Sequence, residues 1–155
     1  MLNRQCGRTY VWILTGLLLL FCFRVAAQLT QVWFPVDALP PFDAWASGAV
    51  PYWLLCMFQV LIIIICSGVI WRIYLGSEVP SGKTGRVLLL LGGVYFGLMC
   101  VRLIVGLVVL PDHFWFGATL PSLFHLVLAS FMLVYGRFHV TAARETRSDG
   151  MTGAA

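Results

Sequence analysis

Charged side chains are scarce in this sequence. They make up only 10% of the 155 residues, whereas an average soluble domain contains roughly 25%. Hydrophobic residues account for 61%. A soluble chain of this length would need many more polar residues to cover its surface. The composition therefore excludes an ordinary soluble domain and indicates that lipid is the solvent.

Lysine and arginine are absent from two of the stretches that separate the apolar runs, residues 35–51 and 111–119. These two stretches carry Asp37, Asp43 and Asp112 instead. Basic residues stand before the first run, between the second and third, and after the fourth. Because positively charged loops stay in the cytoplasm, we predict that both termini are cytoplasmic, N-in/C-in. The basic residues that give the net charge of +4 are thus distributed as expected for membrane orientation. Nucleic acid is not expected as a partner.

Several chemical signatures are also missing. None of the five cysteines forms a C-x-x-C pair or lies in the two outer stretches, so we expect no disulfide framework, zinc site or thiol-oxidising quinone enzyme. No Asp or Glu lies inside an apolar run, which disfavours a proton-coupled carrier. H-E-x-x-H, G-x-S-x-G and phosphate-binding glycine loops are absent. We therefore predict no catalytic and no metal-binding residues.

Four apolar runs are present, at about 10–34, 52–74, 87–110 and 120–138. Each is close to the roughly 20 residues that a helix needs to cross about 30 Å of hydrocarbon. They are too long and too uniformly apolar to be strands of a membrane barrel. The sequence predicts an all-α membrane protein, a bundle of four transmembrane helices over residues 10–139. Residues 1–9 are expected to be cytoplasmic, and residues 140–155 to form a flexible cytoplasmic tail.

The first run admits a second interpretation. Arg4 and Arg8, the apolar stretch 11–23 and the sequence Val25-Ala26-Ala27 resemble a signal peptide with a V-x-A cleavage site. Cleavage there would leave three spans and the same charge bias. The arginine at position 24, immediately before the site, and the apolar residues that follow it favour an uncleaved first span.

Polar residues inside the runs need an explanation, because an arginine at the centre of a membrane helix costs at least about 2.5 kcal/mol. These residues are Arg24, Gln28, Gln31, Gln59, Arg102 and His125. From the rise of about 1.5 Å per residue, most of them are expected about 8–12 Å below the outer surface. Helical spacing places the polar residues of each helix on one face. We predict one polar layer near the outer face, directed into the bundle.

The predicted layer has two interpretations. In the structural one, the arginines pair with Asp37, Asp43 or Asp112 of the outer loops, and the amides and His125 form interhelical hydrogen bonds. In the functional one, the layer binds an anion, a lipid headgroup or a quinone carbonyl. Haem is less favoured, because only one histidine lies inside a run, although His113 of the outer loop could supply a second ligand. The cofactor therefore stays unknown.

Two shorter features complete the pattern. Gly93 and Gly97, with Gly92 beside them, form a G-x-x-x-G motif, for which we favour packing within the molecule over the alternative of a homodimer. Residues 39–48 predict a short interfacial turn of helix, either an ordered connection or a lid over the layer. The stretch 81–85 is interpreted as a polar turn with basic flanks.

Several short motifs occur along the chain between about Leu20 and His139. They are Phe23-Arg24-Val25 with Gln28, Leu39-Pro40-Pro41, Trp45-Ala46-Ser47-Gly48, Pro51-Tyr52, Gln59, Tyr95-Phe96, Arg102 and Pro121 to Phe124-His125. Together they resemble an uncharacterised family of small four-helix bacterial inner-membrane proteins. Since no activity is established for that family, the resemblance implies an architecture and a location but no mechanism.

From these features we expect a multi-pass protein of the inner membrane that is not an enzyme, and an accessory or assembly subunit in particular. The alternative is a small redox, quinone-binding or haem-binding component in which Arg24, Arg102 and His125 contact the ligand. An anion or lipid carrier is less favoured, because the inner half shows no second polar site. The expected partners are the lipid bilayer and either another protein or a second copy of the chain.

Overall fold

Four helices make up the described part of the chain. The structure, a computed structural model, describes residues 4–34, 36, 39, 51–109 and 119–152. The helices are α1 (Arg4–Trp33), α3 (Tyr52–Tyr74), α4 (Gly82–Val108) and α5 (Thr119–Thr152). All four are long and apolar enough to cross a membrane. The prediction of an all-α fold with four helices of membrane-spanning length is confirmed.

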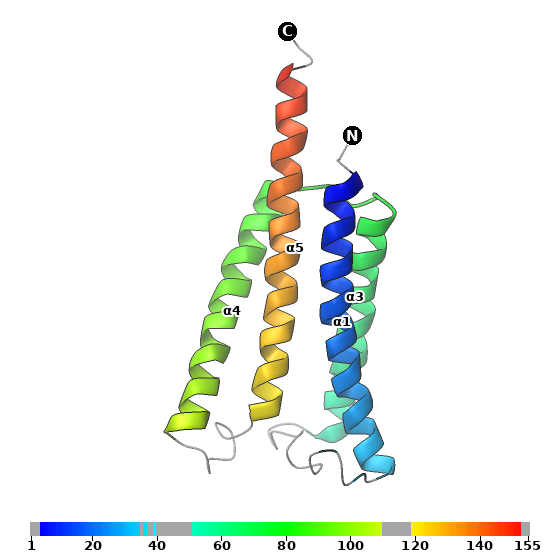
Figure 1. The fold of residues 1–155 in the computed structure, drawn as a ribbon, viewed down its shortest axis with the longest axis vertical. Coiled ribbons are helices and arrows are strands. Elements are labelled where there is room, and N and C mark those ends of the chain that lie inside the picture. Colours follow the sequence, from blue (N-terminus) through cyan, green and yellow to red (C-terminus); the bar gives the residue numbers. More distant parts are fainter. Residues whose placement is uncertain (1–3, 35, 37–38, 40–50, 110–118, 153–155) are drawn as a thin grey trace.

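The helices contact one another in the order α3, α1, α5, α4 (Figure 1). The helices α1 and α5 are central and touch each other, while α3 packs on α1 and α4 packs on α5. In the part of the chain that the structure describes, no Cα atom of α3 lies within 8 Å of one in α4. The bundle is therefore an open series of contacts and not a closed ring.

Aliphatic and aromatic side chains of α1, α3 and α5 form the core. The core cluster consists of Leu14, Cys66, Ile73, Phe131, Phe138 and Ala142. Beside it, the ring of Tyr10 meets Phe138 edge-on with a centroid distance of 5.6 Å. The Tyr10 hydroxyl lies 3.4 Å from Oγ1 of Thr141. These contacts hold α1 against α5 near the end of the bundle that carries both termini (Figure 1).

Two glycines bring the backbones of α4 and α5 together. A Cβ atom added to Gly85 would lie 2.8 Å from the carbonyl oxygen of Gly136 and 2.9 Å from the backbone nitrogen of Val140. A Cβ atom on Gly136 would in turn lie 3.0 Å from the carbonyl oxygen of Gly85. Small residues at such a crossing let two membrane helices approach closely. Neither glycine is part of a motif that would distinguish it in the sequence.

The predicted G-x-x-x-G motif divides between two faces of α4. A Cβ atom on Gly92 would lie 3.2 Å from side-chain atoms of Leu133 on α5, so Gly92 packs inside the molecule. At Gly93 and Gly97 an added Cβ atom would meet nothing within 4 Å. The favoured interpretation, packing within the molecule, is therefore wrong for these two glycines, because no neighbouring helix of the described chain lies against them. The alternative of a homodimer through them stays a prediction.

The ends of α3 and α4 have local causes. After α3, Gly76 adopts a φ of 68°, and its N–H donates to the carbonyl oxygen of Ile73 while that of Ser77 donates to Arg72. This is a Schellman ending, in which glycine is favoured because of the positive φ. Ser81 caps α4, since its hydroxyl accepts from the backbone nitrogen of Thr84 at 3.4 Å. The interpretation of residues 81–85 as a turn is therefore wrong, because the cap starts a helix there.

The last helix is longer than its apolar run. α5 contains 34 residues and continues to Thr152, so the segment 140–155, predicted as a flexible tail, is helical as far as that residue. At about 1.5 Å per residue, the helix is about 51 Å long, against about 30 Å of hydrocarbon. Its C-terminal part projects beyond the other helices (Figure 1).

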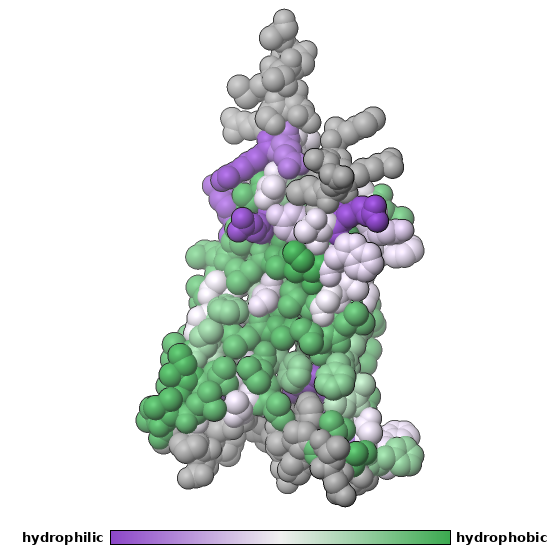
Figure 2. Space-filling model, viewed as in Figure 1, coloured by the Kyte–Doolittle hydropathy of each residue, from purple (hydrophilic) through white to green (hydrophobic). Residues whose placement is uncertain are grey.

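The side of the molecule is mostly apolar, and hydrophilic residues gather at the end that carries the termini (Figure 2). On α4, for example, Leu90, Leu98 and Ile104 are each at least 60% exposed. An exposed apolar face of this kind suits contact with lipid chains. The four apolar helices and this surface suggest a multi-pass membrane protein.

Candidate functional site: a polar layer with a cavity

Four of the residues predicted to form the polar layer are almost completely buried. The exposed fractions are 6% for Arg24, 1% for Gln28, 3% for Gln59 and 7% for Arg102. His125 is partly buried. Each lies on a face of its helix that packs on a neighbouring helix. On α1, Arg24 and Gln28 share that face because they are four residues apart. The structure thus directs these polar groups into the bundle and away from lipid.

A hydrogen bond between two amides joins α1 to α3 within the layer. Nε2 of Gln59 donates to Oε1 of Gln28 over 3.0 Å. Nε2 of Gln28 is itself buried and has no hydrogen-bond partner in the described part of the chain. A buried donor without a partner costs about 1–3 kcal/mol.

Gln31, one turn further along α1, holds the chain that follows the helix. Its Oε1 accepts from the backbone nitrogen of Val36 over 2.9 Å. Its Nε2 lies 3.4 Å from the carbonyl oxygen of Val36 and 3.3 Å from that of Leu39. Gln31 therefore has a structural role at the end of α1 and differs in that respect from Gln28 and Gln59.

Aromatic residues connect the two arginines through α5. The guanidinium carbon of Arg24 lies 5.1 Å from the ring centroid of Phe124, within the range of a cation–π interaction. Nδ1 of His125 lies 2.6 Å from the hydroxyl of Tyr95 on α4. Arg102 follows Tyr95 by seven residues on α4 and therefore lies on the same face of that helix. Polar groups from α1, α4 and α5 thus lie within electrostatic range of one another.

A cavity of about 200 Å³ lies among α1, α3 and α5 in this layer. Its polar lining comes from all three helices: Arg24, Gln59 and His125. The other lining residues are apolar: Phe21, Leu55, Phe58, Ile62, Pro121, Phe124 and Leu128. An apolar cavity with a few convergent polar groups is the usual form of a small-molecule site. We call it the polar cavity.

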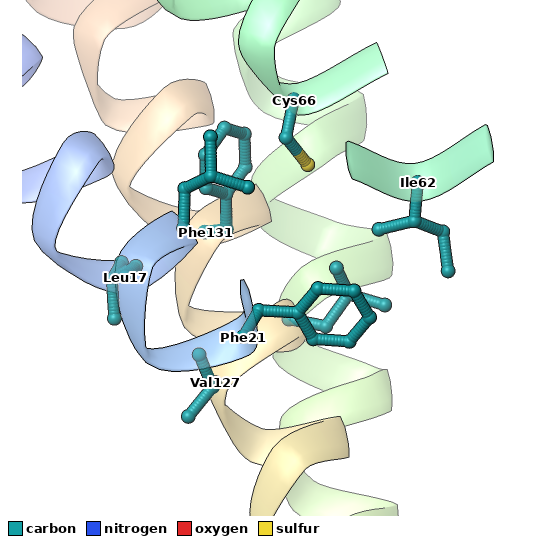
Figure 3. Close-up of a pocket in the computed structure, with 8 residues that line it drawn as sticks. Leu17, Phe21, Ile62, Cys66, Val127 and Phe131 are labelled. Atoms are coloured by element: carbon teal, nitrogen blue, oxygen red, sulfur yellow. The ribbon is translucent and has the colours of Figure 1, made fainter. Parts of the chain in front are cut away.

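A small apolar crevice, with a volume of about 10 Å³, lies beside the polar cavity among the same three helices. The two share Phe21, Ile62 and Leu128. In the crevice, the Phe21 side chain extends from α1 toward α3, and the thiol of Cys66 points from α3 into the space between them (Figure 3). The volume of the crevice is about that of one water molecule.

A second polar cluster, at the opposite end of the bundle, was not anticipated. Glu78, between α3 and α4, forms an ion pair with Arg72 at 2.9 Å and accepts a hydrogen bond from the Tyr135 hydroxyl at 2.9 Å. Nδ1 of His139 accepts from the backbone nitrogen of Ser81 at 3.2 Å. The proton of the neutral ring is then on Nε2, which lies 3.6 Å from Glu78. This Glu78 cluster fastens the α3–α4 connection to α5.

The sequence contained one signal of this cluster. Glu78 is the only acidic residue between the second and third runs, in a connection that is otherwise basic or neutral. A hydropathy profile alone assigns such a residue to a solvated loop and gives no sign of its contacts with α5.

The two histidines of α5 are too far apart to bind one haem iron from opposite sides. His125 and His139 are 14 residues apart on one helix, which separates them by about 21 Å. Within the described segments, no group of three or more His, Cys, Asp and Glu side chains is placed to hold a metal ion. His113 and the predicted counter-charges Asp37, Asp43 and Asp112 lie outside the described residues.

No protein-family model, curated protein or solved structure matches this chain. The resemblance to a family of small inner-membrane proteins therefore stays a prediction from short motifs, and the site must be interpreted from its own chemistry.

Proposed function

We propose that the protein is a non-enzymatic multi-pass protein of the inner membrane with both termini in the cytoplasm. The support is the placement of charge. Arg8, Arg72, Lys83 and Arg86 belong to the end of the bundle that carries the termini (Figure 1). By the positive-inside rule this end faces the cytoplasm. The polar cavity then lies in the outer half of the membrane.

Within the membrane, the protein binds the polar part of a lipid-soluble ligand. The observation that supports this proposal best is the convergence of Arg24, Gln59 and His125, from three helices, on one cavity of about 200 Å³. Polar groups in hydrocarbon are costly and mark functional sites by default. The side chains of Arg24, Gln59 and His125 offer hydrogen bonds to an acceptor oxygen in the cavity.

The proposal is tested by mass spectrometry of the protein purified in nanodiscs, after organic extraction. Wild-type protein should carry a small molecule, and Gln59→Leu should lose it. Met57→Leu is the matched control, because Met57 lies on the same helix and is 61% exposed. Circular dichroism should show the same helix content in all three proteins. A wild-type protein that carries no ligand and binds no fatty acid, phospholipid or quinone would contradict the proposal.

One observation favours an additional role as an accessory or assembly subunit. The C-terminal part of α5 continues to Thr152 and projects beyond the other helices (Figure 1). Such a helix offers a surface to a protein at the membrane. A stable complex should co-purify with the full chain and be lost when the chain is truncated after Ala143. Equal recovery of the complex with the truncated chain would exclude this role for the helix.

A further inference from the structure

The lining of the polar cavity carries charge of one sign only. Arg24 contributes a guanidinium, which stays protonated and has five N–H donors and no acceptor. No acidic side chain is among the described residues that line the cavity. Arg24 and Gln59 are both almost completely buried, so their polar groups are shielded from bulk water. A ligand with a negative charge and acceptor oxygens therefore suits this lining better than a neutral or a cationic ligand.

The donors reach the cavity from three directions, with Arg24 on α1, Gln59 on α3 and His125 on α5. Nε2 of Gln59 has two N–H groups, one of which donates to Gln28. The bond between Nδ1 of His125 and the Tyr95 hydroxyl holds the imidazole ring. In the tautomer that accepts this bond, Nε2 carries the ring proton and is a donor. A phosphate with three acceptor oxygens matches three separate donors, whereas a carboxylate has only two oxygens.

The size of the cavity limits which part of a lipid it can hold. Its volume of about 200 Å³ equals roughly seven water molecules at about 30 Å³ each. Sites that enclose a whole drug-sized ligand usually have about 300–1,000 Å³. The polar cavity therefore has room for a phosphate and the few atoms attached to it, but not for acyl chains.

The chains have a place outside the cavity. Phe58, which lines the cavity on α3, is 52% exposed, so this wall borders the surrounding lipid. In the described part of the chain, no Cα atom of α3 lies within 8 Å of one in α5, although both helices line the cavity. A headgroup in the cavity can thus stay attached to chains that remain in the bilayer beside α3.

We propose that the polar cavity binds the phosphate headgroup of an anionic lipid, whose acyl chains stay in the membrane. The phosphate oxygens accept hydrogen bonds from Arg24, Gln59 and His125, and the charge of Arg24 selects for the anion. This inference rests on the proposed function and names its ligand class.

The test compares two lipids that differ only in the phosphate, dioctanoylphosphatidic acid and dioctanoylglycerol. The full-length protein is kept in dodecyl maltoside micelles, which contain no phosphate, and native mass spectrometry gives the lipid-bound fraction during each titration. Wild-type protein should bind the phosphatidic acid at least about tenfold more tightly, as expected for hydrogen bonds to a charged group. Equal dissociation constants for the two lipids would overturn the phosphate assignment.

A pair of variants on α3 locates the binding site. Leu55→Phe narrows the polar cavity without removing a polar group, because Leu55 is one of its apolar lining residues. Met57→Phe is the matched control, since Met57 does not line the cavity and is 61% exposed. Leu55→Phe should weaken binding of the phosphatidic acid about tenfold, and Met57→Phe should leave it unchanged. Equal binding by the two variants would show that the phosphate is held elsewhere, at the basic end of the bundle for example, and would overturn the proposal.

A third variant tests the charge. Arg24→Gln should weaken binding of the phosphatidic acid about tenfold and leave binding of dioctanoylglycerol unchanged. An equal loss for both lipids, with helix content unchanged in circular dichroism, would overturn the role of Arg24 in selecting the anion. If Arg24→Gln does not fold, the comparison of Leu55→Phe with Met57→Phe still decides whether the cavity binds the phosphate.

Two further arms separate the source of the phosphate and the proposed function. Inorganic phosphate at the same concentration should not displace the phosphatidic acid, and displacement would overturn the assignment to a lipid. If a fatty acid or a quinone binds more tightly than the phosphatidic acid and Gln59→Leu abolishes that binding, the ligand class is wrong and the proposed function stands. If none of these compounds binds, both fail.

Discussion

Replacing Gly85 by alanine should destabilise the protein by about 1 kcal/mol. The new Cβ atom would lie 2.7 Å from Cγ2 of Val140, 2.8 Å from the carbonyl oxygen of Gly136 and 2.9 Å from the backbone nitrogen of Val140. Non-bonded carbon atoms settle at about 3.5–4.0 Å, so α4 must move away from α5 by about 1 Å. Because two of the three atoms belong to the backbone of α5, no rotamer change relieves the clash.

The magnitude is the balance of two opposite effects. Overpacking of this kind costs typically 1–3 kcal/mol, and a gap of about 1 Å forfeits a quarter to a half of the dispersion energy of the contacts it opens. Alanine is a better helix former than glycine by about 1 kcal/mol, which offsets part of the loss. The steric cost is the larger of the two, because it extends along the whole α4–α5 contact.

The control is on the same helix. Gly93→Ala has the same gain in helix propensity, and its Cβ atom would meet nothing within 4 Å. We expect this variant to be between neutral and about 1 kcal/mol more stable than wild type. The free energy of unfolding is measured by titration with sodium dodecyl sulfate in mixed micelles, followed by circular dichroism. Equal stability of Gly85→Ala and Gly93→Ala would refute the close contact between α4 and α5.

The remaining predictions concern polar contacts and orientation. Tyr135→Phe should cost about 1 kcal/mol in the same titration, because it removes the hydrogen bond to Glu78, while Tyr74→Phe, at a tyrosine that is 67% exposed, should change nothing. Gln59→Leu should lower the free energy of unfolding by about 1 kcal/mol, since it leaves the amide of Gln28 without its hydrogen bond. Adding Gln28→Leu should restore part of that loss. Strictly additive losses in the double variant would count against the pair. Alkaline phosphatase fused to the C-terminus should be inactive, and a fluorescent protein fused there should fluoresce, because the C-terminus is predicted to be cytoplasmic; the reverse pattern would disprove that orientation.

The sequence predicted the spans well because hydropathy reports directly on lipid contact. The second run, residues 52–74, coincides with α3. The other helices extend beyond their apolar runs at one end or both, since polar residues continue a helix into water without changing the hydropathy pattern. α4, for instance, begins at Gly82, five residues before its apolar run.

The order in which the helices pack was not predictable in the same way. A surface that faces lipid and a surface that faces another helix are both apolar, so hydropathy does not distinguish them. Contact between α4 and α5 depends on Gly85 and Gly136, which are ordinary glycines until the partner helix is known. The polar residues of the layer were easier to identify, because burial in lipid makes each of them conspicuous. Their common cavity, however, depends on which helices are neighbours.

The two ends of the bundle are held by different kinds of contact, and this difference bears on how a ligand reaches the cavity. At the end with the termini, the Glu78 cluster fastens the α3–α4 connection to α5, and the glycine crossing brings α4 and α5 into backbone contact. In the polar layer, α3 is joined to α1 by the bond between Gln28 and Gln59. A hydrogen bond between membrane helices contributes on average only about 0.6 kcal/mol. We therefore expect α3 to separate from α1 more readily in this layer than at the other end. Under the proposed function, we therefore expect a ligand to enter the polar cavity sideways from the lipid as α3 moves, with the Glu78 cluster as the fixed end of that motion.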